Sequence, residues 1–135
     1  MEFDITKEKI NVFKIRKTYC FKHYFNDREV FEELSKYYNE KKYRFECGTA
    51  GERNKIIKYL WKVGFDAYLI EDPVEYIVKI DRTKKYAPIL KSSIEQIETG
   101  NIRLFLMKDK AAVEQAIESG AERCTDETEF KRLIQ

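Results

Sequence analysis

The chain has 135 residues, of which 43% are hydrophobic and 37% are charged, and its formal net charge is +2. This length favours a single domain over residues 1–135 and suffices for a hydrophobic core without disulfides or metals. No apolar run is long enough to span a bilayer. The charged N-terminal residues, MEFDITKEKI, differ from a signal or transit peptide. We therefore expect a cytoplasmic protein with no membrane partner.

The cysteine and histidine content argues against a metal site. The sequence has 3 cysteines at wide spacing, no C-x-x-C pair and 1 histidine, His23. Structural zinc sites need clustered thiolate and imidazole ligands, so we expect free thiols and neither a metal nor an organic cofactor. The abundance of Lys, Glu and Ile, with few Gln, is typical of heat-tolerant proteins.

Hydrophobic periodicity and capping residues predict alternating strands and helices. The stretch 10–25 reads as one long strand or two short ones, with an interruption near Lys17. Its alternation predicts that Phe13, Ile15, Tyr19, Phe21 and Phe25 share one face. The elements expected after it are a helix capped by Asn26, a strand over 43–47, a helix over 51–63, strands over 65–70 and 74–80, a helix from Pro88 to Gly100, a strand over 102–107, a helix capped by Asp109 and a short helix capped by Asp126.

The order of these elements predicts an α/β (mixed α+β) fold. The short segment Glu71-Asp72-Pro73 favours a hairpin between the strands on either side. Strand–helix alternation elsewhere favours parallel pairing. We therefore expect a single mixed, mostly parallel sheet with helices packed on it, in the order β-α-β-α-β-β-α-β-α. The first six elements are similar in order to Alba-type and related small nucleic-acid-binding folds, a similarity that no sequence motif accompanies.

The loop Cys47-Gly-Thr-Ala-Gly-Glu-Arg53 resembles the Cys-x5-Arg signature of the cysteine-dependent phosphatases. In that chemistry, backbone amides and an arginine hold a phosphate while a thiolate attacks it. The resemblance implies a thiol-dependent phosphatase-like or anion-binding protein, with Cys47 and Arg53 at the site and Asp72 as the general acid.

A capping interaction explains the same loop without catalysis. Thr49 and Glu52 fit the capping box Ser/Thr-x-x-Glu directly before an apolar helix. Glu52 would then occupy backbone amides that a phosphate needs, and its carboxylate would repel the anion. The chain also lacks the histidine that commonly precedes the phosphatase cysteine, because Glu46 stands there. We therefore favour a non-catalytic protein.

Basic residues interleaved with aromatic residues predict nucleic-acid binding. Residues 1–67 hold 15 Lys and Arg against 11 Asp and Glu, whereas residues 68–135 hold 11 against 13. Cationic side chains contact phosphates, and aromatic rings stack on bases. The residues predicted to bind DNA or RNA are Lys14, Arg16, Lys22, Tyr24, Lys41, Lys42, Tyr43, Arg44 and Arg53. We therefore expect a binding module whose basic N-terminal half is the contact surface.

A protein–protein interaction or assembly subunit is the remaining alternative. Tyr37, Tyr38, Tyr59 and Trp61 lie at the ends of predicted helices or beside their apolar stripes. Aromatic residues beyond those a core needs are typical of interfaces. The partner would be a second copy of the chain or another protein.

Overall fold

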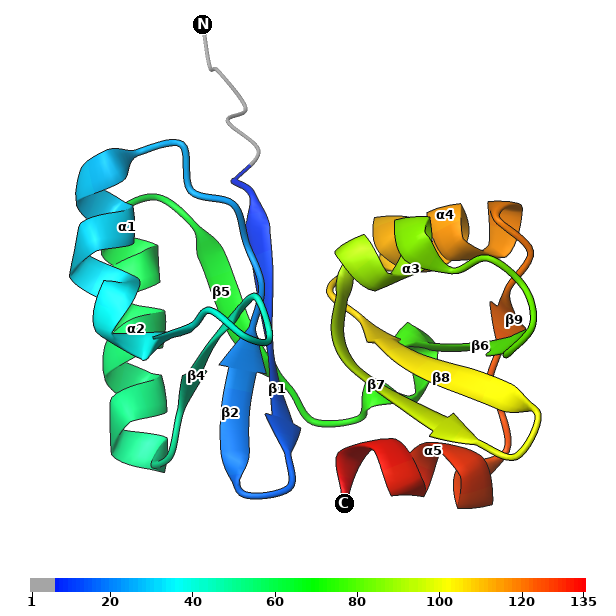
Figure 1. Ribbon diagram of the computed structural model, residues 1–135. Helices are drawn as coiled ribbons and strands as arrows, with labels where there is room; N and C mark the ends of the chain where they lie inside the picture. The colour runs from blue at the N-terminus through cyan, green and yellow to red at the C-terminus, as the bar shows by residue number, and fades with distance from the viewer. Residues whose placement is uncertain (1–6) are drawn as a thin grey trace, which may run out of the picture.

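Two β-sheets stand side by side in the computed structural model, which describes residues 7–135 (Figure 1). The first six residues of the predicted domain lie outside this range. The first sheet has the strand order β3 (Tyr38–Asn39), β4 (Arg44–Cys47), β2 (Thr18–Phe21), β1 (Lys9–Ile15), β5 (Asp66–Ile70). The second has the order β7 (Ser93–Thr99), β8 (Ile102–Met107), β6 (Ile77–Asp81), β9 (Glu122–Arg123). We call residues 7–70 the N-terminal unit and residues 77–135 the C-terminal unit.

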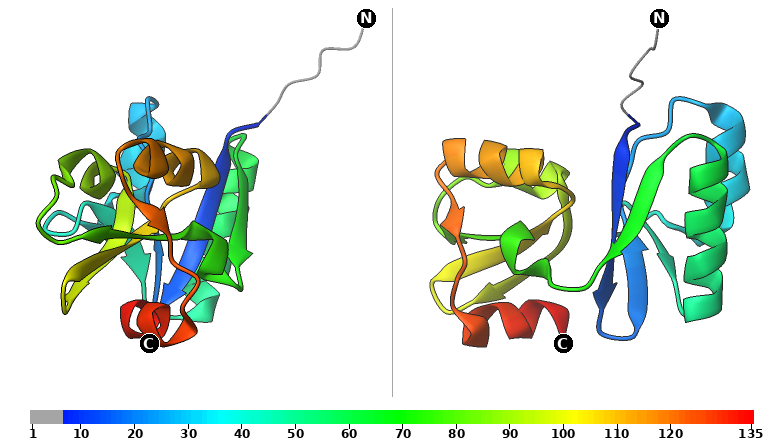
Figure 2. Two further views of the ribbon diagram at one scale, coloured as in Figure 1. Left: turned by 90° about the vertical axis from the view of Figure 1, so that its right-hand side faces the viewer. Right: turned by 180° about the vertical axis from the view of Figure 1, so that it is seen from behind.

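Each sheet carries its own helices (Figure 1). Helices α1 (Arg28–Leu34) and α2 (Ala50–Lys62) cover the outer face of the first sheet, and the 3₁₀ turn η1 (Ser35–Tyr37) follows α1. Helices α3 (Ala87–Lys91) and α4 (Lys110–Glu118) cover one face of the second sheet. Helix α5 (Glu127–Ile134) packs on the other face and reaches the β1–β2 hairpin, where Ile134 O accepts from the Arg16 amide at 2.7 Å (Figure 2). No helix in residues 7–135 is long and apolar enough to cross a membrane.

The predicted mixed α+β class is confirmed, but the single, mostly parallel sheet is not. Residues 7–135 form two sheets, in which only β1 and β5 pair in parallel. The stretch 10–25 forms two strands, because the chain reverses at Arg16, which adopts a positive φ of 56°. The fold therefore begins with a hairpin, and its architecture differs from the Alba-like element order.

The segment Glu71-Asp72-Pro73 crosses between the sheets and does not form the expected hairpin. Ile70 pairs with Phe13 in the first sheet, while Ile77 pairs with Leu106 in the second. Asp72 accepts from the Val74 amide and caps the 3₁₀ turn η2 (Pro73–Tyr76), which carries the chain across. The same Asp-Pro chemistry suits a tight turn and this crossover, so local sequence does not distinguish them.

The expected helix from Pro88 to Gly100 is wrong, because only residues 87–91 are helical. The chain then forms β7, whose β-branched residues Ile94, Ile97 and Thr99 favour a strand. Gly100, expected to end the helix, instead has φ 60° in the turn between β7 and β8.

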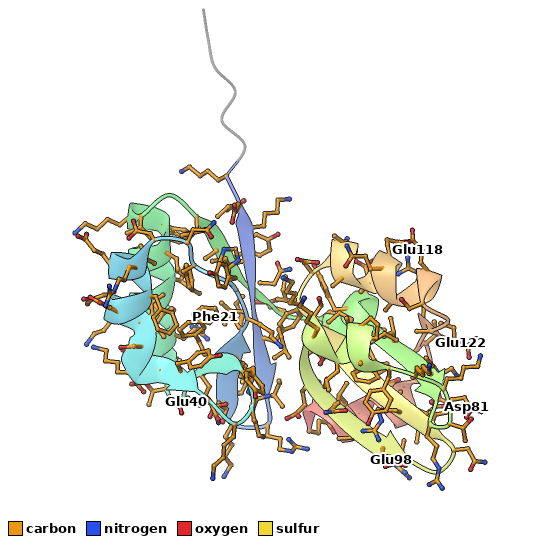
Figure 3. All side chains as sticks on the ribbon, turned by 45° about the horizontal axis from the view of Figure 1, so that its top comes forward. Phe21, Glu40, Asp81, Glu98, Glu118 and Glu122 are labelled. Atoms are coloured by element: carbon orange, nitrogen blue, oxygen red, sulfur yellow. The ribbon has the colours of Figure 1, made fainter. Side chains whose placement is uncertain are left out.

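Apolar residues fill three layers, which explains why both faces of β1 are buried. Ile10 and Val12 contribute to the core beneath α1 and α2, where Phe21 also lies (Figure 3). Phe13 and Ile15 point to the opposite face, into a core shared by the two units. The predicted common face of Phe13 and Phe21 is therefore wrong, because the turn at Arg16 resets the alternation. The third layer lies between the second sheet and helices α3 and α4.

Candidate nucleic-acid interface

A groove of about 790 Å³ lies where the two units meet. One wall comes from the end of β2 and the β3–β4 turn, and the other from α3, β7 and the end of β8. The side chains that line it are those of Lys22, His23, Tyr24, Tyr38, Lys41, Lys42, Tyr43, Phe45, Ala87, Leu90, Lys91, Ser92, Ser93, Ile94, Glu95, Gln96 and Lys108. The site thus depends on residues that lie up to 86 positions apart in the chain, from Lys22 to Lys108.

The groove is strongly basic. Five lysines line it against one carboxylate, Glu95. Oε2 of Glu95 lies 3.7 Å from Nζ of Lys42, 3.6 Å from Arg16 and 3.3 Å from the buried Arg44. The single acidic group is therefore already balanced by cations. Within residues 7–135, Lys22, Lys41, Lys91 and Lys108 form no ion pair with a carboxylate, and this excess of positive charge favours an anionic ligand.

Two exposed tyrosines flank this basic surface. Tyr24 is 81% exposed and Tyr43 is 65% exposed, unusually open positions for aromatic side chains. Tyr43 also has a positive φ of 53°, a conformation that costs a non-glycine residue free energy. Asn39 holds the turn before it by accepting from the amides of Lys41 and Lys42, at 3.0 and 3.2 Å. The turn therefore presents a ring at the mouth of the groove.

Arg44 is the predicted phosphate contact that the structure places out of reach. It is 4% exposed, and its guanidinium donates to Glu46 Oε2 at 2.9 Å, Ile94 O at 2.8 Å and Glu95 Oε2 at 3.3 Å. Burial opposes the charged form of Arg44, but the hydrogen bond to Glu46 and the charges of Glu46 and Glu95 outweigh it and raise the pKa of Arg44. The residue joins the two units beside the groove and is not part of its lining.

Lys22 and His23 lie at the inner end of the groove. Nζ of Lys22 donates to Ser93 O at 3.0 Å, and burial together with the charge of Lys108 lowers the Lys22 pKa. Nε2 of His23 lies 3.0 Å from Oε2 of Glu8. Burial lowers the pKa of His23, although Glu8 opposes this shift. The imidazole is therefore neutral near pH 7.

The other predicted contacts fall in different places. Lys22, Tyr24, Lys41, Lys42 and Tyr43 line the groove, and Arg16 approaches it through Glu95. Lys14 and Arg53 lie instead over the ring of Tyr19, at 5.7 and 4.8 Å from its centroid. These two residues belong to a separate surface near the start of α2.

The loop at Cys47 forms the expected helix cap. The Thr49 hydroxyl accepts from the Glu52 amide at 3.1 Å and donates to the Glu52 carboxylate at 3.2 Å. The carboxylate thus contacts the threonine hydroxyl, whereas a complete capping box would place it on the Thr49 amide. Burial and the charge of Glu52 raise the pKa of the Cys47 thiol, which disfavours a thiolate.

The residues of the phosphatase alternative do not converge. Arg53 donates to its neighbour Asn54 at 3.0 and 3.2 Å, and its guanidinium stacks on Tyr19. Cys47 lies on β4, and Asp72 follows β5, with β2 and β1 between these strands. Three strand spacings correspond to about 14 Å, too far for a general acid and a thiol to share one phosphate.

Sequence reasoning missed the contribution of the C-terminal unit. Lys91, Leu90 and Lys108 complete the groove, although residues 68–135 are acidic overall. Asp81, Glu98, Glu118 and Glu122 lie on the side of this unit that faces away from the N-terminal unit (Figure 3). The acidic balance of residues 68–135 therefore does not exclude lysines from this wall of the groove. The antiparallel pairing of β7 with β8 brings Lys91 and Lys108, which lie beyond the paired ends, to the same wall.

Comparison with known proteins gives no guide to function. No family model matches the chain, and neither the curated proteins nor the solved structures include a significant match. Within residues 7–135, no group of three or more His, Cys, Asp or Glu side chains is arranged to hold a metal ion.

Proposed function

We propose that the protein binds single-stranded nucleic acid in the groove between its two units. The observation that carries this proposal is the combination of five lysines with exposed Tyr24 and Tyr43 around one concave surface. Lysine ammonium groups neutralise backbone phosphates, and tyrosine rings stack on bases. The single carboxylate in the groove, Glu95, is already paired.

A single strand suits the groove better than a duplex does. Bases within a duplex stack on one another and cannot stack on Tyr24 or Tyr43 unless they are unpaired. Leu90, which is exposed, adds an apolar side chain to the groove lining beside the tyrosines. These side chains can contact the faces of unstacked bases, while the lysines around them contact phosphates.

Fluorescence anisotropy with labelled oligonucleotides of about 12 nucleotides tests the proposal. We expect single-stranded DNA or RNA to bind more tightly than a duplex of the same sequence. If the protein neutralises three or four phosphates, the logarithm of the association constant should fall linearly with the logarithm of the salt concentration, with a slope of about −2 to −3. No binding at low salt, or stronger binding of the duplex, would contradict the proposal.

Matched charge variants locate the interface. The double variant Lys41→Gln/Lys91→Gln removes one cation from each wall of the groove. It should weaken binding about tenfold at low salt and reduce the salt slope by about 1.4. The control Lys55→Gln/Lys58→Gln removes the same charge from exposed positions of α2 outside the groove lining. An equal loss of affinity in both double variants would show only a dependence on net charge.

Tyrosine variants test the stacking contacts separately. Tyr24→Ala and Tyr43→Ala leave the net charge unchanged and should each weaken binding about tenfold. Their salt slopes should match that of the wild-type protein, because no phosphate contact is lost. Tyr59→Ala, on α2 and outside the groove lining, provides the control.

A further inference from the structure

The groove continues past His23 and Lys108 into a smaller recess of about 490 Å³. These two residues line both spaces, so they mark the junction between them. The recess is otherwise lined by Glu8, Lys9, Asn11, Tyr68, Tyr76, Asp109, Lys110 and Ala111. A single strand of nucleic acid bound in the groove would pass His23 and Lys108 if its sugar–phosphate backbone turned toward the recess.

His23 has the surroundings of a general base. Its Nε2 lies 3.0 Å from the Glu8 carboxylate, which places the ring proton on Nε2 and makes Nδ1 the nitrogen that can accept a proton. Phe25 and Phe65 hold the ring, with centroid distances of 4.8 and 5.1 Å. Its lowered pKa keeps it neutral near pH 7, the state in which it can accept a proton.

Lys108 supplies a cation at the same junction. Its side chain lines the groove and the recess, as that of His23 does, and Lys22 lines the groove beside them. The positive charge of Lys108 also lowers the pKa of His23 and of Lys22. The backbone carbonyl of Lys108 accepts from Nδ2 of Asn11 at 3.0 Å, and Asn11 is 7% exposed. This buried contact anchors the end of β8 against β1 and fixes the position from which the Lys108 side chain extends.

We propose that this junction cleaves RNA without a metal, by attack of a ribose 2′-hydroxyl on the adjacent phosphodiester; the activity rests on the single-strand binding proposed above. His23 Nδ1 takes the proton of the 2′-hydroxyl while the O2′–P bond forms. The P–O5′ bond breaks, and the Lys108 ammonium gives a proton to the departing O5′. The products are a 2′,3′-cyclic phosphate and a 5′-hydroxyl end, and solvent returns both side chains to their starting protonation states.

The side chains at the junction favour RNA as the substrate, because RNA carries its own nucleophile, the 2′-hydroxyl. The nucleophile belongs to the substrate, so the protein needs only a base, an acid and positive charge near the phosphate. His23, Lys108 and Lys22 supply these functions. DNA lacks the 2′-hydroxyl and should bind without being cut. Glu8 acts as a positioning residue, because it contacts the imidazole rather than the reacting atoms.

The test incubates the wild-type protein with an RNA oligonucleotide in the presence of EDTA. The same sequence as DNA and as 2′-O-methyl RNA provides uncleavable controls. We expect RNA fragments with 2′,3′-cyclic phosphate ends and no cleavage of either control. His23→Asn, purified in the same way, should reduce the rate at least a hundredfold, a much larger effect than its effect on binding of the DNA. Lys108→Gln should slow cleavage by a similar factor.

The pH profile provides the readout for Glu8. Glu8 raises the pKa of His23, so Glu8→Gln should move the acidic limb of kcat/KM to lower pH. This readout also serves if a His23 variant does not fold. RNA cleavage that survives His23→Asn, or a Glu8→Gln profile identical to the wild type, would overturn the assignment. DNA binding without RNA cleavage would overturn only this inference, whereas an absence of binding would overturn the proposed function as well.

Discussion

Arg44 of β4 and Glu95 of β7 form a largely buried ion pair between the two units, with Nη1 3.3 Å from Oε2. The side chains are only 4% and 12% exposed. Arg44 also donates to Ile94 O of the C-terminal unit at 2.8 Å. One guanidinium therefore contributes both to the contact between the units and, through Glu95, to the charge of the groove.

Replacing Glu95 should affect stability and binding in opposite directions. Glu95→Gln removes one of the two carboxylates that Arg44 contacts within residues 7–135 and should lower the free energy of unfolding by about 2 kcal/mol. The same change removes the only acidic group of the groove and frees Lys42, so affinity for single-stranded nucleic acid should rise severalfold. Urea denaturation and anisotropy measure the two effects.

Glu98→Gln is the matched control on the same strand. Glu98 is 44% exposed and lies 3.3 Å from Arg82 and 3.4 Å from Arg103. Exposed ion pairs contribute at most about 1 kcal/mol, so this variant should be nearly as stable as the wild type. Lower affinity after Glu95→Gln, with the fold intact, would contradict the assignment of the groove.

Most features that depend on neighbouring residues were predictable from the sequence, although the predicted cap Asn26 is wrong because Asp27 caps α1. Thr49, Asp109 and Asp126 cap α2, α4 and α5 as expected, because a cap is a hydrogen bond to an amide two or three residues later. The ends of α2 and α4 follow from Gly64 and Gly120, which adopt positive φ values of 100° and 105°. These interactions form within one turn of chain and need no tertiary context.

Features that depend on distant segments were not predictable. Strands β5 and β6 adjoin in sequence but belong to different sheets, because Ile70 pairs with Phe13 in the first sheet and Ile77 pairs with Leu106 in the second. For the same reason, the sequence indicated the residues of only one wall of the groove. Lys41 and Lys42 stand out in a basic stretch, whereas Lys91 is an isolated lysine in an acidic half-chain. Its role follows from the packing of α3 and β7 against the N-terminal unit.

The cysteines should be unreactive in the folded protein. Burial raises the pKa of Cys20 to about 12 and also raises those of Cys47 and Cys124. A disulfide reagent that labels thiols at pH 8 should therefore react slowly with the native protein. In denaturant it should react rapidly with all three thiols. Cys47, at 8% exposure, should be the first to react as the protein opens. Immediate stoichiometric labelling of native Cys47 would restore the reactive-thiol interpretation of its loop.

Mild acid should destabilise the fold through His23. Its pKa is lowered from 6.5 in the folded state, mainly by burial, with Glu8 and Asp109 opposing and Lys108 reinforcing the shift. Below pH 6.5 the unfolded chain therefore binds more protons at His23 than the folded protein does. The contribution of His23 to the free energy of unfolding is complete above pH 6.5 and falls as the pH drops toward the pKa of the folded state. Urea midpoints measured between about pH 7.5 and 5.5 should decline for the wild type and stay flatter for His23→Gln. Glu46, with its pKa lowered below 4.5, loses its contribution only in more acidic solution. An identical decline in both proteins would assign the effect to other groups.

The predicted single domain implies that both units unfold together. Phe13, Ile15 and Cys20 share a core with Ile77 and Leu104 of the other unit, and Arg44 adds a charged link. Trp61, the only tryptophan, lies on α2 and reports on the N-terminal unit, whereas far-ultraviolet circular dichroism reports on both. Because separating the units would expose this shared core, the two probes should give coincident urea transitions. Phe13→Ala should shift both midpoints equally, by about 3 kcal/mol in the free energy of unfolding. A circular dichroism signal that persists beyond the Trp61 transition would show instead that the C-terminal unit is stable on its own.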